Sequence, residues 1–173
     1  MSPAGSWGRW TVATCKPDAT RRGLVGSILE WISAEVRLVE LRTTIVTETQ
    51  IFAHYADMIA LDDRFPFDVR AELRRGWVGR PVTVALFQGE AEGTPERVRK
   101  LLGHYDPARA VPNTIRGHFG VDSITQARAE NRFIDNLIHT SDDATGAERE
   151  FGIWFGSAFA HLLTPQHKEL SRD

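Results

Sequence analysis

The stretch "WTVATC" (10–15), followed by "GLVGSILEWISAEV" (23–36), holds the first two elements of the chain and decides how the fold begins. The β-branched residues of the first segment favour a β-strand. In the second segment, Val25, Ile28 and Ile32 recur at helical spacing, which favours an amphipathic helix. The sequence therefore opens with a β-α unit.

Further along the chain this unit recurs after additional helices. Strands are predicted at "RLVELRTTIVT" (37–47), "PVTVALFQG" (81–89) and "RFIDNLI" (132–138), and helices at "TQIFAHYADMI" (49–59), 68–75, "TPERVRKLLG" (94–103) and "DDATGAEREFGIWF" (142–155). This order is the split β-α-β pattern of ferredoxin-like sandwiches. We expect an α+β fold of that type, βαββαβ, with helices stacked on one face of a four-stranded antiparallel sheet and with additional helices and insertions.

Two of these helices carry signals at their ends. Thr49 is the predicted N-cap of the helix at 49–59, and Thr94 is the predicted N-cap of the helix at 94–103. Pro95 falls in the first turn of that second helix and Gly103 is expected to stop it.

The composition is that of one globular domain. The chain has 173 residues, of which 42% are hydrophobic and 25% charged, and its formal charge is -2, so it lacks the basic excess typical of nucleic-acid binding. Polar ends predict a flexible N-terminal tail (1–8) and a C-terminal tail (165–173) around a domain at 9–164.

Cysteine usage and hydropathy indicate a compartment. Cys15 is the only cysteine, so no internal disulfide can form, which favours a reducing cytoplasm. No early stretch resembles a signal peptide, and no run approaches the roughly 20 apolar residues of a membrane span. We expect a cytoplasmic protein that binds neither nucleic acid nor membrane.

Lys16 is the first candidate for chemistry. Pro17 cannot join a strand ladder and favours an extended Lys16, so the ammonium group would project from the end of the strand toward a ligand. A cation at the end of a strand, before a glycine-bearing turn, is a reasonable anion-binding site, although the spacing of the glycines and the lysine excludes a P-loop. The alternative is a solvated turn with a surface lysine.

Arginines form a second candidate group, because a guanidinium offers several donors to phosphate oxygens. Arg97 and Arg99 lie on the predicted helix at 94–103, where a solvated helix face is the alternative. Arg116 stands between a turn signal and a glycine, where the backbone can pass close to a ligand. Arg109 is a further candidate.

The segment "NLIHTSD" (136–142) brings an amide, an imidazole, a hydroxyl and a carboxylate together. His139 follows apolar residues, so it should be half shielded from water, mostly neutral at about pH 7, and able to act as acid, base or nucleophile. Glu150 could accept a proton from one ring nitrogen and leave the other lone pair free, with Ser141 between them. A Ser-His-Asp hydrolytic triad and an ordinary core histidine are the alternatives.

The remaining histidines show no zinc-binding spacing, and no metal ligand is predicted. They are expected to be surface or packing residues: His54, His104, His118, His161 and His167.

Four segments together resemble the nucleoside diphosphate kinases. They are "KPDATRRGLVG" (16–26), "HYADM" (54–58), "PNTIRGHFG" (112–120) and "NLIHTSDDATGAEREFGIWF" (136–155), in the family's order and at compatible distances. The most specific piece is Asn-x-x-His-x-Ser-Asp followed by a helix that contains Ala-Glu-Arg-Glu. The match extends over nearly the whole chain.

The resemblance implies a ferredoxin-like phosphotransferase with a ping-pong mechanism, which moves the γ-phosphate of ATP or another nucleoside triphosphate to a nucleoside diphosphate. It implies that His139 becomes a phosphohistidine while Glu150 and Ser141 orient the imidazole. Contacts to ribose and phosphates would come from Lys16, Tyr55, Arg99, Tyr105, Arg116 and Asn136, and contacts to the base from Phe67 and Phe133. Mg²⁺ would be bound mainly through the nucleotide phosphates, and the assembly would be a homo-oligomer, a tetramer or a hexamer.

Several positions depart from the family pattern. Tyr105 replaces a threonine expected near the β-phosphate, and the other replacements are Asn113 for glycine, His118 for an acid and Thr140 for glycine. The chain is also longer between Tyr55 and Pro81, and by about ten residues within "GVDSITQARAENRFID" (120–135). This second insertion borders the predicted pocket and could act as a lid, narrow the base preference or alter subunit packing.

These departures leave two alternatives to a general nucleoside diphosphate kinase. One is a specialised phosphotransferase or phosphohydrolase that keeps the phosphohistidine and acts on a narrower or modified nucleotide. The other is a nucleotide-binding module in which catalysis has decayed.

Overall fold

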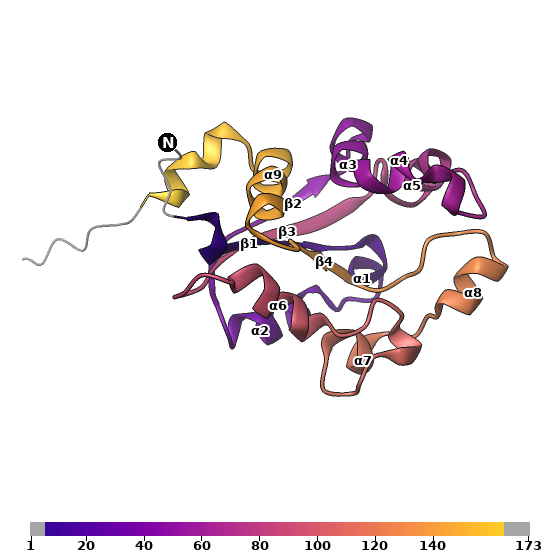
Figure 1. Ribbon diagram of the computed structural model, residues 1–173, viewed down its shortest axis with the longest axis horizontal. Helices are drawn as coiled ribbons and strands as arrows, with labels where there is room; N and C mark the ends of the chain where they lie inside the picture. Colours follow the sequence, from indigo (N-terminus) through magenta and orange to yellow (C-terminus); the bar gives the residue numbers. More distant parts are fainter. Residues whose placement is uncertain (1–5, 165–173) are drawn as a thin grey trace, which may run out of the picture.

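The computed structural model describes residues 6–164. Its strands are β1 (Trp10–Cys15), β2 (Arg37–Ile45), β3 (Pro81–Gln88) and β4 (Ile138–Thr140). They form one antiparallel sheet in the order β2-β3-β1-β4 (Figure 1). With the helices between them, this order gives the predicted ferredoxin-like α+β fold.

Helices fill the connections between the strands. Between β1 and β2 lie α1 (Pro17–Arg21) and α2 (Val25–Ser33), and between β2 and β3 lie α3 (Glu48–His54), α4 (Ala56–Ala60), η2 (Asp62–Arg64) and α5 (Val69–Trp77). Between β3 and β4 lie α6 (Thr94–Leu102), η3 (Pro107–Arg109), α7 (Ile115–Phe119) and α8 (Ile124–Ala129), and α9 (Ala144–Trp154) and η4 (Ser157–Leu163) follow β4.

The central strands β1 and β3 are covered on both faces, because their side chains alternate between two hydrophobic clusters. Val12 and Val84 belong to the cluster that α3, α5 and α9 complete, whereas Ala13 and Ala85 belong to the one that α2 and α6 complete. Figure 1 shows these two groups of helices on opposite sides of the sheet. The expectation that helices cover only one face is therefore wrong.

Two predicted helix caps are also wrong. Thr47 is the N-cap of α3, since its hydroxyl accepts from the backbone of Gln50 and the Gln50 side chain accepts from the backbone of Thr47, so Thr49 lies inside the helix. Before α6, Gly93 with a φ of 79° is the cap. Thr94 is the first residue of the helix, and its hydroxyl donates to the carbonyl of Ala91 at 2.7 Å.

The last strand is shorter and later than predicted. The sequence favours a strand at 132–138, but β4 begins at Ile138 and pairs with β1 so that His139 lies opposite Thr14. Leu137, immediately before it, has a φ of 74°. Pairing with a neighbouring strand requires extended backbone, which this left-handed residue interrupts. The chain before Leu137 therefore turns out of the sheet.

The N-terminal part of the described chain packs on the domain. The short helix η1 (Trp7–Arg9) precedes β1, and the ring of Trp7 lies 5.5 Å from that of Phe151 in α9. The predicted tail at 1–8 thus overlaps packed residues at its end, whereas 1–5 and the predicted tail at 165–173 lie outside the described residues. Among residues 6–164, no helix combines the length and apolar character that a membrane crossing needs.

Candidate active site

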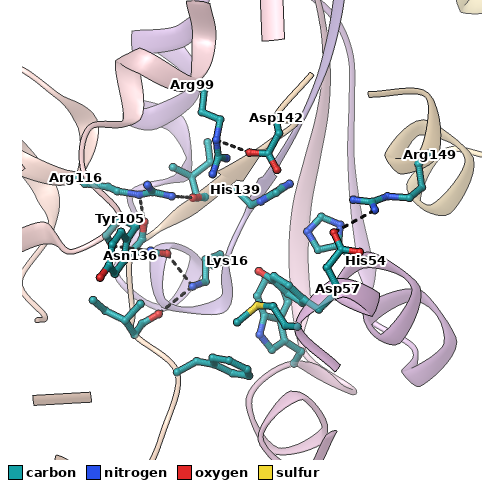
Figure 2. Close-up of a pocket in the computed structure, with 16 residues that line it drawn as sticks. Lys16, His54, Asp57, Arg99, Tyr105, Arg116, Asn136, His139, Asp142 and Arg149 are labelled. Carbon is teal, nitrogen blue, oxygen red and sulfur yellow. Dashed lines mark hydrogen bonds and ion pairs between the residues drawn. The ribbon is translucent and has the colours of Figure 1, made fainter. Parts of the chain in front are cut away.

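A cavity of about 310 Å³ lies where β1 ends and β4 begins (Figure 2). The residues that the sequence proposed converge on it from several elements. Eight of them line it: Lys16, Tyr55, Arg99, Tyr105, Arg116, Phe133, Asn136 and His139. Glu150 is hydrogen-bonded to His139, and Ser141 is hydrogen-bonded to Glu150. Phe67 packs against Phe133.

Lys16 reaches the cavity because β1 stops at Cys15 and Pro17 starts α1 at once. Its ammonium group donates to the carbonyl of Ile134 at 3.0 Å and to Oδ1 of Asn136 at 2.9 Å. The side chain is buried, and this burial lowers its pKa. Asn136 is fixed in turn, since its Nδ2 donates to the carbonyl of Tyr105 at 2.8 Å.

Arg116 holds the segment before β4 in place. Its guanidinium donates to three backbone carbonyls: Asn136 at 3.1 Å, Ile138 at 2.7 Å and Gly103 at 3.3 Å. Burial, together with the charge of Arg99, lowers the pKa of Arg116 to about 10. Arg116 therefore stabilises the turn beneath His139 as well as lining the cavity.

Leu137 forms this turn with support on both sides. Its backbone N–H donates to Oδ2 of Asp18 at 3.0 Å, and its carbonyl accepts from the backbone of Lys16 at 2.8 Å. A non-glycine residue at positive φ costs about 1–3 kcal/mol, and such strain is often found at functional sites. The turn places Asn136 and His139 on the same cavity.

His139 is oriented by Glu150 and Ser141. Its Nε2 lies 2.7 Å from Oε1 of Glu150, and the Ser141 hydroxyl donates to Oε2 of Glu150, also at 2.7 Å. Ser141 accepts from the backbone of Val12 at 3.0 Å, which ties it to β1. The Ser141 hydroxyl thus donates its hydrogen bond to Glu150, whereas in a hydrolytic triad the serine would donate to the histidine.

The protonation state of His139 suits a nucleophile. Burial, followed by the charge of Arg99, lowers the pKa of His139 to about 3, so the ring is neutral at physiological pH. With the ring proton on Nε2 and bound to Glu150, the lone pair of Nδ1 is available. Glu150 is fully buried, and this burial raises its pKa above 4.5 while the nearby His54 and the Ser141 hydroxyl oppose the rise.

Arg99 comes from α6, on the other side of the cavity. Its Nη1 donates to the carbonyl of Thr140 at 2.9 Å, and its Nε forms a 2.5 Å ion pair with Asp142. Figure 2 shows this pair beside His139. Both side chains are partly exposed, so the ion pair can be exchanged for an anionic ligand.

The two segments that lengthen the chain meet at an aromatic cluster. Phe133 lines the cavity, and its ring lies 4.9 Å from Phe67 and 5.8 Å from Phe65. The Phe67 and Phe133 rings are nearly perpendicular, at 82°. They contact each other directly, so a base could stack between them only if they separated.

The segment 120–135, named the strap below, has a defined structure. Arg132 donates to both carboxylate oxygens of Asp122, at 2.7 and 3.1 Å, and the backbone of Asp135 donates to Asp122 at 2.8 Å. These contacts close the strap at its base around α8, which lies away from the sheet (Figure 1). The strap thus presents Phe133 to the cavity from a constrained loop.

Tyr105 lies at the rim, half exposed, with its ring 4.6 Å from that of His104. Sequence reasoning missed other lining residues, among them His54, Asp57, Trp77 and Arg149. His54 was expected to be a surface or packing residue. Its position immediately before Tyr55 was the available signal, because the residue next to a site residue at a helix end can face the same space.

The chain is similar to known proteins in both sequence and fold. The family model described as nucleoside diphosphate kinase matches residues 9–159. A nucleoside diphosphate kinase from a Nocardioides species is 36% identical, over 84% of this chain and 95% of the relative. A transition-state mimic of the Borrelia burgdorferi nucleoside-diphosphate kinase, with bound vanadate and ADP, superposes with a TM-score of 0.76 at 32% identity, over 87% of this chain and 88% of that one. An NDP kinase structure from Pyrobaculum aerophilum gives a TM-score of 0.72 at 28% identity, over 87% and 97% of the chains.

Proposed function

Since the chain belongs to the nucleoside diphosphate kinase family, we propose that it transfers the γ-phosphate of a nucleoside triphosphate to a nucleoside diphosphate through His139. The single observation that carries the assignment of His139 is its double contact: Nε2 is bonded to Glu150, while the ring lines a cavity that contains Lys16 and Arg99. The family match and the Borrelia burgdorferi structure support the reaction and do not favour a specialised or decayed protein.

In the first half of the reaction, the Nδ1 lone pair of His139 attacks the γ-phosphorus. The Nδ1–P bond forms, the bond from phosphorus to the bridging oxygen breaks, and the nucleoside diphosphate leaves with that electron pair. The imidazole gains positive charge, which the Glu150 carboxylate stabilises through the Nε2 hydrogen bond. An oxygen of the second diphosphate reverses these steps and regenerates neutral His139.

Cationic side chains stabilise the charge of the phosphates. Lys16, Arg99 and Arg116 line the cavity together, which supports binding of a diphosphate and of the transferring phosphoryl group. Tyr55 is also in the lining, and burial raises its pKa, so it stays protonated and can act as a donor. We assign the ribose and the transferring phosphate to Lys16 and Asn136.

Mg²⁺ would enter with the nucleotide and be bound mainly through its phosphates, where it would neutralise phosphate charge. The described lining fits this arrangement, because its carboxylates are Asp57 and Asp142, and both already contact arginines. Neither forms part of a cluster of acidic ligands that would bind the ion without a nucleotide.

The base would lie against Phe133, and Phe67 would contact its other side once the two rings separate. Stacking accepts any base, because every base has a π-face. Tyr105 at the rim would then lie near the diphosphate.

We also propose that the protein is a cytoplasmic homo-oligomer, a tetramer or a hexamer. The buried single thiol of Cys15 is compatible with a reducing compartment. β2 lies at one edge of the sheet and exposes Leu38, Leu41 and Ile45, an apolar edge that a second copy would cover. Light scattering would give the mass, and a monomer would contradict this part of the proposal.

Labelling with [γ-³²P]ATP and Mg²⁺ tests the assignment. We expect an acid-labile, base-stable label on the wild type that a nucleoside diphosphate removes, and no label on His139→Ala. His161→Asn, at an exposed histidine outside the cavity, serves as the matched control and should label normally. Retention of the label in His139→Ala would exclude His139 as the phosphorylated residue.

A further inference from the structure

His54 has a fixed tautomer that the proposed mechanism does not use. The indole Nε1–H of Trp154 donates to Nδ1 of His54 at 3.1 Å. An indole N–H can only donate, so Nδ1 of His54 must present its lone pair. Burial also lowers the pKa of His54 well below 6.5, which keeps the ring neutral. Its single ring proton therefore resides on Nε2.

This Nε2–H group is buried without a partner. The residue is 5% exposed, and Nε2 has no hydrogen-bond partner among the described residues. A buried donor without an acceptor costs about 1–3 kcal/mol, so its presence calls for a physical reason. The donor is thus available to an acceptor that arrives with the ligand.

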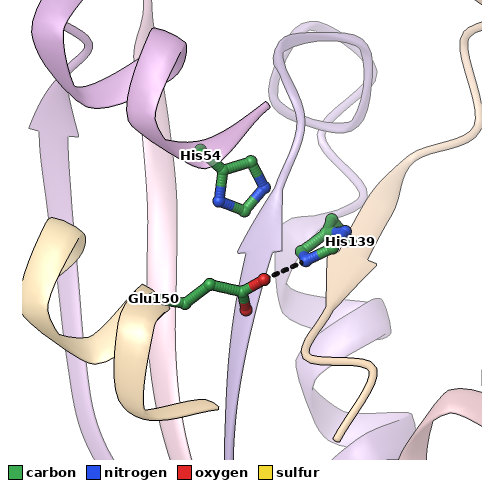
Figure 3. Close-up of side chains that lie close together, drawn as sticks. All are labelled: His54, His139 and Glu150. Carbon is green, nitrogen blue, oxygen red and sulfur yellow. Dashed lines mark hydrogen bonds and ion pairs between the residues drawn. The ribbon is translucent and has the colours of Figure 1, made fainter. Parts of the chain in front are cut away.

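The position of His54 indicates which acceptor. His54 lines the cavity, and its ring centroid lies 4.4 Å from that of His139, with the ring planes at 83°. Figure 3 shows His54 from α3, His139 from β4 and Glu150 from α9 converging at one point. A ring nitrogen of each histidine and a carboxylate oxygen of Glu150 all lie within 4.8 Å of one another.

The same three side chains could in principle hold a divalent metal, since two imidazoles and a carboxylate form a common zinc set. The Trp154 bond argues against that use. A metal at Nε2 of His54 would need the lone pair there, but the indole requires it on Nδ1. A hydrogen-bond donor is therefore the form of His54 that its surroundings favour.

Resting on the proposed function, we propose that His54 is a further catalytic residue, whose Nε2–H donates a hydrogen bond to an oxygen of the phosphoryl group carried by His139. When a phosphoryl group is bound to the His139 ring, its oxygens lie within about 3 Å of the attacked nitrogen. Because the ring centroids of His54 and His139 are 4.4 Å apart, such an oxygen is within reach of the His54 Nε2–H donor. The bond would add a neutral donor to the charges of Lys16, Arg99 and Arg116. His54 keeps its proton throughout the transfer.

A fixed donor is useful here because it needs no rearrangement when the phosphoryl group arrives. Preorganised donors aimed at developing charge lower the barrier more than mobile ones. Trp154 supplies the preorganisation, as its indole removes the other tautomer. The unpaired donor of the free protein is then satisfied only in the phosphorylated state, which favours that state over the unphosphorylated protein.

Two amide variants separate the two ring nitrogens. In His54→Asn, the side-chain oxygen can replace Nδ1 and accept from Trp154, but no donor remains near the Nε2 position. In His54→Gln, the longer amide can place a donor there, while the acceptor for Trp154 is weakened. We expect His54→Asn to phosphorylate His139 from MgATP about 10- to 100-fold more slowly, and His54→Gln to recover most of this rate.

The readouts distinguish this role from packing. Kd values for MgADP and Tm values are measured beside the single-turnover labelling rate, and we expect the rate of His54→Asn to fall without a parallel loss of MgADP affinity. Equal rates for wild type and His54→Asn, or equal losses in both amide variants, would overturn the inference. An unlabelled wild type would instead contradict the proposed function itself.

A measurement on the wild type keeps the test independent of variant folding. The ¹⁵N shifts of His54 should report a protonated Nε2 and an unprotonated Nδ1, and the Nε2 proton should move downfield when MgATP phosphorylates His139. The opposite tautomer, or an Nε2 proton that is unchanged by phosphorylation, would overturn the inference. Trp154→Phe, which lacks the indole donor, should allow both tautomers.

Discussion

Asp142 and Arg99 form a 2.5 Å ion pair on the wall of the cavity. The Asp142 carboxylate thereby engages the Nε–H of Arg99, a donor that a nucleotide phosphate would need. The pair joins the turn after β4 to α6, and the guanidinium also donates to the carbonyl of Thr140. A diphosphate that binds Arg99 must therefore compete with Asp142.

Asp142→Asn should remove this competition. We expect the KM for the nucleoside diphosphate to fall about two- to fivefold, because exposed ion pairs are worth a fraction of a kcal/mol to about 1 kcal/mol. Steady-state kinetics at low and high salt would measure it, with a smaller effect at high salt. Asp63→Asn, which makes the same charge change outside the cavity, is the control. The same KM in both variants would speak against competition.

Glu150→Gln tests the charge behind the nucleophile. The amide has the size of the carboxylate but cannot stabilise the positive charge that the His139 ring acquires, so we expect the labelling rate to fall about 100-fold. Rapid-quench labelling measures this rate. Glu148→Gln, at an exposed position of α9, should keep the wild-type rate. A wild-type rate in Glu150→Gln would show that the carboxylate charge is not needed.

Arg116→Lys should destabilise the fold. A lysine cannot reach the carbonyls of Asn136, Ile138 and Gly103 at once, so at least two of these backbone acceptors lose a charged donor. We expect a loss of about 3 kcal/mol in the free energy of unfolding, measured by urea denaturation. Arg109→Lys, on the surface, should change it little. A normal stability for Arg116→Lys would mean that these bonds are replaced.

The depressed pKa of His139 predicts how stability depends on pH. The pKa of His139 is about 3 in the folded chain and 6.5 in the unfolded chain. At pH values between these two, the unfolded chain therefore binds one more proton than the folded chain. Stability from this group therefore rises with pH across that window, by at most about 1.4 kcal/mol per pH unit, and is constant above it.

The difference in unfolding free energy between wild type and His139→Gln isolates this contribution, because glutamine does not titrate. Glu150, whose pKa is raised by burial, contributes with the opposite slope in both proteins. Denaturation series from about pH 4 to 8 would measure the difference. A difference that stays flat below pH 6.5 would mean that His139 titrates like a free histidine.

Asp122→Asn should loosen the strap. Burial alone would raise the pKa of Asp122, but bonds from Arg132 and from the backbone of Asp135 and Ser123 lower it overall, so the carboxylate is held ionised. The variant weakens these bonds, and we expect faster hydrogen exchange across 122–135. If the strap presents Phe133 to the base, the nucleotide KM should also rise. Unchanged exchange would show that the ion pair does not hold the strap.

The sequence accounts for much of the sheet. The β-branched and apolar residues of "WTVATC" and "PVTVALFQG" placed both central strands, because such runs favour strands that are buried on both faces. It did not place β4, since the β-branched and aromatic residues of "RFIDNLI" look like a strand. There the side chains of Asp18 and Arg116 and the backbone N–H of Lys16 hold the left-handed turn at Leu137, and these residues are distant from it in sequence.

The sequence by itself determined which chemical groups the site contains, because the amide, histidine, hydroxyl and carboxylate of 136–150 lie close together along the chain. Only the tertiary structure decided how they act. Burial sets the charge of His139, Glu150 selects its free nitrogen, and Trp154 selects the tautomer of His54. The physical reason is that proton positions depend on solvent exclusion and on partners from other elements, neither of which is encoded in local spacing.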